Sequence, residues 1–552
     1  MIINHNLMSL SAVNASRTTH DMLQKSVQPL ASGLRISSAA DDASGIAISE
    51  KIRSQTAGYS MAVKNAQDGI SLLRVAEGAL SNTSSILQRM RELSIQSSND
   101  VLTSQDRKHL NEELQELKGK LDLVADTAQF NTKKLLDGTS GIMWSSDTLS
   151  LKASARAGAT LSQKPEGTYR LEIRATPGNA QIQKSNIFDA GTLIKIQQDT
   201  ASEDTDADTE TFTVFSEEAN TLRDISQFYT SGNAFAVSEP QTLIVIQGSG
   251  QTADITVYGN DTLYDLAEKI NGAISDTLGQ AAYVDDSGKF STLTDTAITP
   301  DDNGETCTVK ASLMIQSAVP GKVGEIFLAG SDEIIHALGM NTVQKSSEST
   351  YSVSVYDAHS GEALASDVKI TGNVMRDALG ENIDVEFSPM AGTSAKWDGK
   401  SEQYILTGDE AYSAVLNLKS AGIIFQIGTN QAENFSVQFG DVSADALGVG
   451  RINVMTQELA ERSIGIIDRA IDDIVKQRTQ ISSYSDSLEH SAANLAQSGS
   501  NLMDAGSRIT DADVAKSTLR FIEFQILSRG QDMIIDAANQ QPEAVYSLLN
   551  KE

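Results

Sequence analysis

The chain has 552 residues, and its 43 Lys and Arg against 73 Asp and Glu give a formal net charge of −30. This balance argues against nucleic acid as a partner, because contacts to phosphates need a basic surface. The single cysteine, Cys307, excludes an intrachain disulfide and a paired-thiolate metal site.

The acidic residues are concentrated in the middle of the chain. Residues 191–450 hold 12 basic and 39 acidic residues, a net charge of −27, which leaves −3 for the two ends together. Nearly neutral ends can pack closely, whereas an acidic middle stays hydrated and repels its copies. This distribution predicts a core built by the ends, with the middle facing outward.

The N-terminal region, residues 1–140, has the spacing of helices. Leu73, Leu80 and Leu87 recur every seven residues, which keeps one seam facing a partner helix, as in a left-handed coiled coil. A second amphipathic helix is expected at 110–124, after a polar turn.

The middle of the chain has the two-residue alternation of β-strands, first at 169–174. A strand–strand–helix unit then occurs twice, within 192–225 and within 242–266, and each helix starts at a Thr and an Asp with capping-box spacing. The first copy contains an extra acidic loop at 199–210, which we expect to be solvated. From about 281 to 445 short strands and turns continue without a period that fixes their topology.

The C-terminal region carries the longest repeat. One heptad register runs through residues 452–505 without a proline and holds six apolar residues: Ile467, Ile474, Ile481, Leu488, Leu495 and Leu502. A lone surface helix is the alternative, but heptads sustained beyond about four repeats indicate a coiled coil. The tail after this segment is again amphipathic.

Motifs that would carry chemistry do not stand out. The six histidines form no His-Glu-x-x-His zinc motif. The run 399–401 (GKS) ends like a phosphate loop, but Ser394 replaces its first glycine, and 248–250 (GSG) fits a hairpin turn better than a dinucleotide site. The acid pairs at 285–286 and 301–302 lack the spacing of a calcium loop. We therefore expect no enzyme activity, no cofactor and no metal.

The first residues lack the pattern of a cleavable signal peptide, and no run approaches the ~18 apolar residues of a membrane span. Taken alone, these features predict a cytoplasmic protein.

Several runs at the two ends are long enough to be specific. They are 32–45 (SGLRISSAADDASG), 65–71 (NAQDGIS), 76–80 (AEGAL), 87–93 (LQRMREL), 507–513 (SRITDAD), 525–527 (QIL), 538–540 (ANQ) and 547–549 (SLL). In this order they resemble bacterial flagellin, the flagellar filament subunit, over roughly 1–140 and 450–552. The strand–strand–helix unit is similar, more weakly, to a repeat inserted in flagellins and related hook-cap proteins.

The resemblance implies a function outside the cell, which replaces the cytoplasmic prediction. The ends would form the inner tube and coiled-coil sleeve of a helical homo-oligomer, the bacterial flagellar filament, which serves motility. The chain would leave the cell unfolded by type III export, with a flagellar export chaperone on its C-terminal region. It would add at the distal tip beneath the filament cap protein, in a filament joined to the hook by the hook–filament junction proteins.

Members of the family also present a patch to the vertebrate Toll-like receptor that senses flagellin. The residues of this chain that match the patch are Arg89, Leu93 and Glu113. The alternative role of the same surface is packing against a neighbouring subunit.

The chain departs from the family pattern in two places. Pro29 stands where the family continues its first helix with a charged residue, which predicts that this helix ends or kinks near Gln28. Residues 521–524 (FIEF) are bulkier than the usual small polar residues, which affects the packing of the inner tube.

We expect a multidomain protein, an N- and C-terminal α-helical coiled-coil bundle with a β-rich α+β insertion. Five segments are predicted: inner-tube helix 1–42, coiled-coil core 43–178, acidic outer domains 179–447, coiled-coil core helix 448–505 and inner-tube helix 506–552.

Three functional hypotheses follow. In the first, a filament subunit buries its apolar seams on assembly, so that its ends order fully only on addition. The second is a hook–filament junction protein, which shares the N-terminal pattern, although the run 538–549 favours the filament. The third is an enzyme carried in the middle domain.

Overall fold

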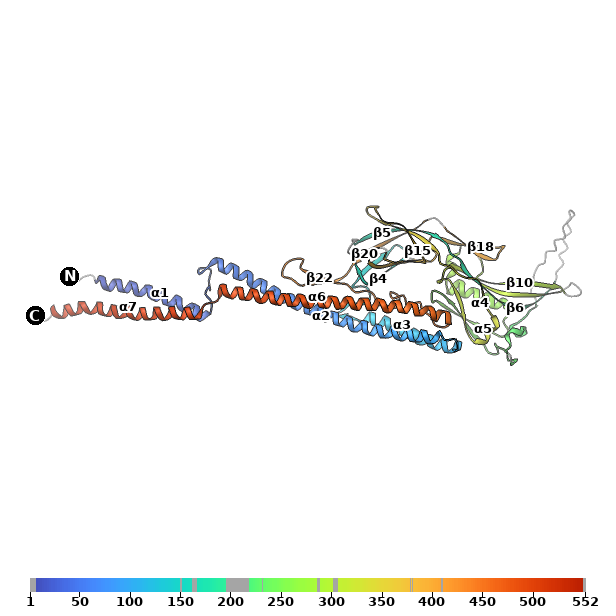
Figure 1. Cartoon of the computed structure of the whole chain (residues 1–552), viewed down its shortest axis with the longest axis horizontal. Helices are drawn as coiled ribbons and strands as arrows, with labels where there is room; N and C mark the ends of the chain where they lie inside the picture. The colour runs from blue at the N-terminus through green and yellow to red at the C-terminus, as the bar shows by residue number, and fades with distance from the viewer. Residues whose placement is uncertain are drawn as a thin grey trace. The chain divides into compact units, whose positions relative to one another are not determined.

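The structure is a computed structural model that describes residues 6–148, 151–160, 166–194, 218–230, 232–284, 288–300, 306–377, 379, 381–408 and 411–549. The chain divides into two compact units. The first contains residues 1–71, 424–435 and 485–552, and the second contains 72–423 and 436–484. Two long helices, α2 (Ala43–Ser97) and α6 (Gln457–Thr510), contribute residues to both units (Figure 1).

The first unit contains the two ends of the chain. Helix α1 (Leu7–Ser32) packs against α7 (Val514–Leu549), so that the N- and C-terminal helices lie side by side (Figure 1). The loops at the inner ends of this pair are tied by backbone hydrogen bonds. Arg35 N–H donates to the Thr510 carbonyl at 2.6 Å, and Ala512 N–H donates to the Gly33 carbonyl at 2.9 Å. Both chain segments therefore break their helices at the same level.

The prediction that the first helix ends near Gln28 is wrong, because α1 continues through Pro29 to Ser32. Pro29 lies in the last turn, so its missing N–H removes one hydrogen bond at a point where the helix is about to end. Gly33 then adopts the left-handed conformation, with φ of 75°, and donates its N–H to the Pro29 carbonyl at 2.9 Å. This closes the helix with the usual glycine cap.

The second unit contains α3 (Ser104–Thr127), which follows the turn expected after residue 97. Its start is a complete capping box: Thr103 accepts from Asp106 N–H at 3.2 Å, and the Asp106 carboxylate accepts from Thr103 N–H at 3.1 Å. Two donors that a helix N-terminus would leave unpaired are thus satisfied.

The insertion between α3 and α6 is built mainly from antiparallel strands. Its first half contains β1 (Gln129–Phe130), β2 (Lys133–Lys134), β3 (Ile142–Ser146), β4 (Leu151–Thr160), β5 (Gly167–Thr176), β6 (Ala180–Ile194), β7 (Glu218–Ala219), η1 (Leu222–Asp224), η2 (Ser226–Phe228), β8 (Gln241–Gln247), β9 (Thr252–Val257), α4 (Leu263–Gly272), η3 (Ala273–Thr277) and η4 (Gln280–Tyr283).

The second half contains β10 (Ser291–Pro300), β11 (Thr306–Pro320), β12 (Ile326–Ala329), α5 (Asp332–Leu338), β13 (Asn341–Gln344), β14 (Thr350–Asp357), β15 (Ala363–Thr371), β16 (Val374–Met375), β17 (Glu381–Phe387), β18 (Thr393–Asp398), β19 (Gln403–Gly408), β20 (Tyr412–Ser420), β21 (Ile423–Gln426) and β22 (Asn434–Val437).

Two larger sheets organise these strands. One has the order β15-β14-β5-β20-β3, and the other has the order β10-β11-β6-β13, with β7 alongside β6. A three-stranded sheet, β12-β8-β9, carries the insertion's contact with α6 that is described below. The remaining pairings are β16-β17-β4, β18-β19, β1-β2 and β21-β22.

The alternation predicted at 169–174 is present in β5. Tyr169, Leu171 and Ile173 are buried in an apolar cluster with residues of β14 and β20, whereas Arg170 and Arg174 are exposed. A separate cluster joins β6, β8, β9, β11 and α4. The insertion therefore has its own apolar cores, independent of the helical seam.

The second copy of the strand–strand–helix unit forms as predicted, as β8, β9 and α4. In the first copy the corresponding helix is a single 3₁₀ turn, η1, with a capping box at Thr221 and Asp224. The second strand of that copy and the acidic loop at 199–210 lie outside the described residues.

The two glycine-containing runs are turns. Residues 248–250 connect the antiparallel pair β8 and β9, and Gly250 has φ of 87°, which explains a glycine there. Residues 399–401 connect β18 and β19, where the Ser401 hydroxyl donates to the Asp398 carboxylate at 2.6 Å. The acid pairs at 285–286 and 301–302 lie outside the described residues.

The predicted segments and the observed elements differ at several boundaries, and the core helix predicted from residue 448 begins at Gln457. The segment 43–178, expected to be coiled-coil core, also contains β1 to β5, because the insertion begins directly after α3. At the C-terminal end α6 continues to Thr510, five residues beyond the predicted boundary at 505.

Candidate assembly surfaces

Helices α2 and α6 run antiparallel, and two ion pairs between them show which residues lie opposite each other. In the second unit Arg478 forms an ion pair with Glu77 at 2.7 Å, and Arg91 pairs with Asp468 at 2.5 Å. As the α2 residue number rises by 14, the α6 partner's number falls by 10. These pairs are half-exposed, so their contribution to stability is small, but they define which turns of the two helices face each other.

Small residues allow the same two helices to approach closely in the first unit. The position that a Cβ would take at Gly506 lies 3.3 Å from Ile52 Cγ2, and at Gly499 it lies 3.6 Å from Tyr59 Cβ. At Gly69 it would lie 2.9 Å from Leu488 Cδ1. Glycines on either helix thus face larger side chains of the other.

Most of the seam predicted from the heptads is buried within one chain. Seven of the nine predicted residues are 3% exposed or less: Leu73, Leu80, Leu87, Ile467, Ile474, Ile481 and Leu488. The last two, Leu495 and Leu502, are half-buried. The helices of a single chain therefore already bury most of this seam.

The α1–α7 pair leaves a large apolar surface open. Twelve of its apolar side chains keep 42–69% of their accessible surface: Leu7, Met8, Leu10, Met22, Val27, Val514, Leu519, Ile522, Ile526, Leu527, Met533 and Ile534. Polar contacts hold the outer end of the pair, where Asn6 Nδ2 donates to the Ala538 carbonyl and Ser9 Oγ donates to Asn539 Oδ1, each at 2.9 Å.

None of the helices in the described part of the chain has the length and apolar character of a membrane span.

The segment 439–455, which we name the strap, leads the chain from the insertion into α6. Side chains from one face of α3 hold its backbone. Asp122 Oδ1 accepts from Ala444 N–H at 2.8 Å, and Asn111 Oδ1 accepts from Val454 N–H at 3.2 Å. Between them, Lys118 Nζ donates to the carbonyls of Gly450 and Ile452, at 3.0 and 2.6 Å. The strap is thus fixed in one position along α3.

Lys118 is buried, and burial lowers the pKa of its amine to about 8, although the carboxylates of Asp445 and Asp122 oppose the shift. The sequence analysis missed this residue. The available signal was a lysine between Leu117 and Leu121, on the apolar side of an otherwise regular helix. A charged residue in that place needs acceptors that only the folded strap supplies.

The structure separates the three residues of the predicted receptor patch. Arg89 and Glu113 are surface residues joined by an ion pair of 2.8 Å, and Arg89 also pairs with Glu92 at 3.1 Å. The carboxylates of these partners raise the pKa of the Arg89 guanidinium. Leu93 is fully buried, so its side chain is not available to an external partner.

Among the residues that the structure describes, no group of three or more His, Cys, Asp and Glu side chains is placed to hold a metal ion.

The two helical ends of the chain are similar to known proteins. Residues 3–141 match the family model described as the bacterial flagellin N-terminal helical region, and residues 464–549 match the C-terminal helical region. A flagellin of Halalkalibacterium halodurans is 49% identical over 158 residues, 29% of this chain and 56% of the relative. The flagellar filament 33 kDa core protein of Treponema phagedenis is 41% identical over 188 residues, 34% of this chain and 66% of the relative.

In the first three relatives the matched part is 37% to 66% of their length. Among solved structures, the chain aligns with flagellar hook associated protein-3 from Legionella pneumophila at 13% identity and a TM-score of 0.26. The alignment covers 86% of this chain and 99% of the solved chain. The family matches confirm the predicted resemblance and the predicted fold class, with helical ends around a β-rich middle.

We predict that Ile474→Ala lowers the free energy of unfolding by about 2–5 kcal/mol, because the side chain is fully buried in the seam. The matched control is the neighbouring Val475, which is half exposed on the same helix. Val475→Ala should change the free energy of unfolding by less than about 0.5 kcal/mol. Urea unfolding of the dilute protein measures both. Equal destabilisation by the two variants would contradict the assignment of the seam.

We predict that the free energy of unfolding contributed by Lys118 rises between about pH 8 and pH 10.5. Below this window the amine is protonated in the folded and the unfolded chain, so the burial penalty is fully present. Within it the folded chain loses the proton first, which relieves the penalty. Unfolding midpoints from pH 7.5 to 10 should therefore rise relative to those of Lys118→Met. The exposed Lys120→Met is the control and should follow the wild type. Parallel pH profiles for wild type and Lys118→Met would refute the prediction.

Proposed function

We propose, from the match of both helical ends to the bacterial flagellin family models, that the protein is the structural subunit of an extracellular flagellar filament. In this role, copies polymerise through their ends and the filament serves motility. The contribution of the chain is mechanical rather than catalytic.

The observation that carries the proposal is the open apolar surface of α1 and α7. Full burial of one Leu, Ile or Met side chain contributes about 1.5–3 kcal/mol. A dozen such side chains exposed on one helix pair mark this pair as a candidate association surface. Copies of the same chain are the proposed cover, because both helices lie within the matched family regions.

Charge favours the association of copies at this surface. Together α1 and α7 contain five basic and five acidic residues, so the pair carries no net charge. Copies can therefore meet there without net repulsion, whereas the net charge of −27 in residues 191–450 keeps the insertions apart and hydrated.

The comparisons favour a filament subunit over a hook–filament junction protein. Relatives named as flagellin or flagellar filament core protein are 41–49% identical over their matched regions. The match also extends through the C-terminal helical region, which includes the run 538–549.

The same premise extends to the partners of the protein. We propose that a flagellar export chaperone binds the C-terminal region, whose apolar side chains would otherwise be exposed before assembly. Subunits then add beneath a filament cap protein, in a filament that joins the hook through junction proteins. Recognition by the flagellin-sensing Toll-like receptor, if it uses this patch, involves the charged pair Arg89 and Glu113 rather than the buried Leu93.

We predict that Ile526→Asp abolishes polymerisation, because it places a charge on the apolar surface that assembly must bury. The neighbouring Gln525 is also exposed, so Gln525→Asp adds the same charge at a position that is already polar. Seeded polymerisation followed by sedimentation measures both variants.

The expected result is loss of sedimentable filaments for Ile526→Asp and filaments from Gln525→Asp. The folded state of the monomers is compared by circular dichroism. Normal filaments from a well-folded Ile526→Asp protein would show that this surface is not the assembly surface.

A further inference from the structure

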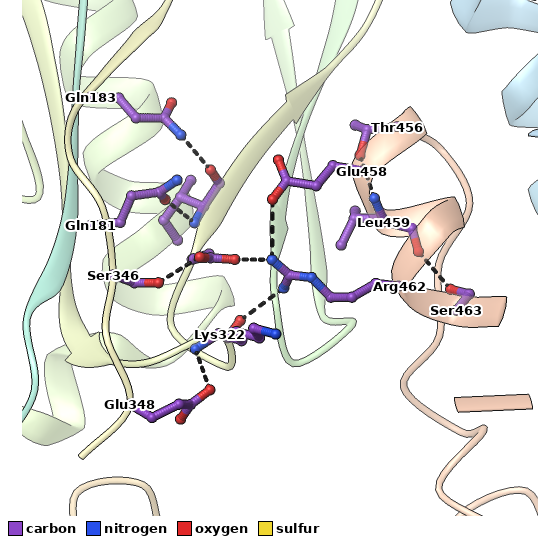
Figure 2. A network of polar contacts seen from close by, with 12 residues as sticks. Gln181, Gln183, Lys322, Ser346, Glu348, Thr456, Glu458, Leu459, Arg462 and Ser463 are labelled. Atoms are coloured by element: carbon purple, nitrogen blue, oxygen red, sulfur yellow. Dashed lines mark hydrogen bonds and ion pairs between the residues drawn. The ribbon is translucent and has the colours of Figure 1, made fainter. Parts of the chain in front are cut away.

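Arg462, in the second turn of α6, reaches across to the β-rich insertion (Figure 2). Its guanidinium forms an ion pair with Glu325, a second pair with Glu458 at 3.3 Å, and a hydrogen bond to the Lys322 carbonyl at 3.3 Å. The same group lies over the Phe327 ring, 5.5 Å from its centroid. The side chain is only 21% exposed, so most of its surface is covered by these partners.

The turn that receives Arg462, residues 321–325, is held in shape by the insertion alone. The Glu348 carboxylate accepts from Lys322 N–H at 3.1 Å, and Ser346 Oγ donates to Glu325 Oε1 at 2.5 Å. Gly248 N–H donates to the Glu325 carbonyl at 2.7 Å. None of these three contacts involves α6, so the turn is held from the insertion side as well as by Arg462.

The strand that follows the turn is fixed in the same way. Ile326 N–H donates to Gln181 Oε1 at 2.7 Å, and Gln183 Nε2 donates to the Ile326 carbonyl at 2.9 Å (Figure 2). Both glutamines are buried residues of β6, which is part of a different sheet. The turn is therefore anchored to two sheets of the insertion.

An apolar contact lies beside the polar one. Ile244, Ile246, Phe327 and Ala329 of the β12-β8-β9 sheet form a buried cluster with Leu459, which is three residues before Arg462 on α6. If water entered between α6 and the sheet, the side chains of this cluster would become hydrated. Because Arg462 covers Phe327 and bridges to Glu325, it closes the cluster on that side.

We infer that the turn 321–325 is a guanidinium site and that Arg462 is the latch that fixes the β-rich insertion to α6. A planar guanidinium presents several donors at once, which suits two carboxylates and a carbonyl; a lysine ammonium lacks this geometry. Glu325 is only 13% exposed in the docked chain, so removal of the guanidinium with α6 still in place would leave a desolvated carboxylate without its cation. Loss of the guanidinium therefore favours local opening between the turn and α6.

A second contact limits what the loss of the latch can do. Ser104, at the start of α3, donates from its hydroxyl and its N–H to Asp332 Oδ1 of α5, at 2.6 and 3.2 Å. The insertion would thus remain attached to α3, and removal of Arg462 should open the α6 side locally. This local opening separates the latch from a general role in folding.

Hydrogen exchange by mass spectrometry on the full-length monomer tests the inference. In Arg462→Met, which keeps the apolar stem but removes the guanidinium, amides of residues 321–327 should exchange about tenfold faster or more. Amides of β5 and β14 should be unchanged, because they lie in a separate cluster. The control is Glu458→Gln, since Glu458 is 66% exposed and pairs with the same guanidinium; it should leave exchange at 321–327 within about twofold.

Unchanged exchange at 321–327 in Arg462→Met, or equal acceleration in Glu458→Gln, overturns the latch. The reciprocal pair Arg462→Glu with Glu325→Arg provides a rescue, and recovery of at least part of the protection supports a direct interaction. If Arg462→Met loses protection throughout the insertion, Arg462→Lys replaces it. That variant should accelerate exchange in the turn alone, and normal protection there would refute the need for the guanidinium.

Discussion

Burial of the α2–α6 seam is the interaction on which the rest of the molecule depends, because it decides which apolar side chains one chain can satisfy by itself. Leu80, Leu87 and Ile474 have no exposed surface, so this part of the seam needs no copy. On α7, by contrast, Leu519 and Met533 remain more than two-thirds exposed although α1 packs beside them. The apolar side chains of the α2–α6 pair are thus buried within one chain, whereas many of those of the α1–α7 pair stay exposed.

The insertion must leave and rejoin the helices without disturbing that seam. It leaves directly after α3 and returns through the strap, whose backbone is held by Asn111, Lys118 and Asp122 of the same α3. These three residues share one face of the helix, at spacings of seven and four. The start and the end of the insertion are therefore both attached to α3. The long insertion between these two points can have its own sheets and cores.

The sequence predicted what depends on local periodicity and could not predict what depends on distant partners. Heptads located α2, α3 and α6, and the alternation at Tyr169 located β5. The fifteen-residue strands β6 and β11 were not recognised at their full length, because their pairing joins segments more than a hundred residues apart. The strap has no regular structure, so its role follows from contacts alone. For Pro29 the steric rule was sound, but its position in the last turn made the penalty small.

Two buried charges, Lys118 beside the strap and Arg462 on α6, specify an alignment that the apolar seam alone does not. An apolar heptad is nearly the same after a shift of seven residues, because Ile474 can take the place of Ile467 without a change in chemistry. The partners of Lys118 and Arg462 do not repeat at that interval, so a shifted helix would leave an ammonium or a guanidinium desolvated and unpaired. Apolar residues at these two positions could pack as well and add as much stability. The charges therefore disfavour a shifted register, Lys118 for the strap on α3 and Arg462 for α6 on the insertion.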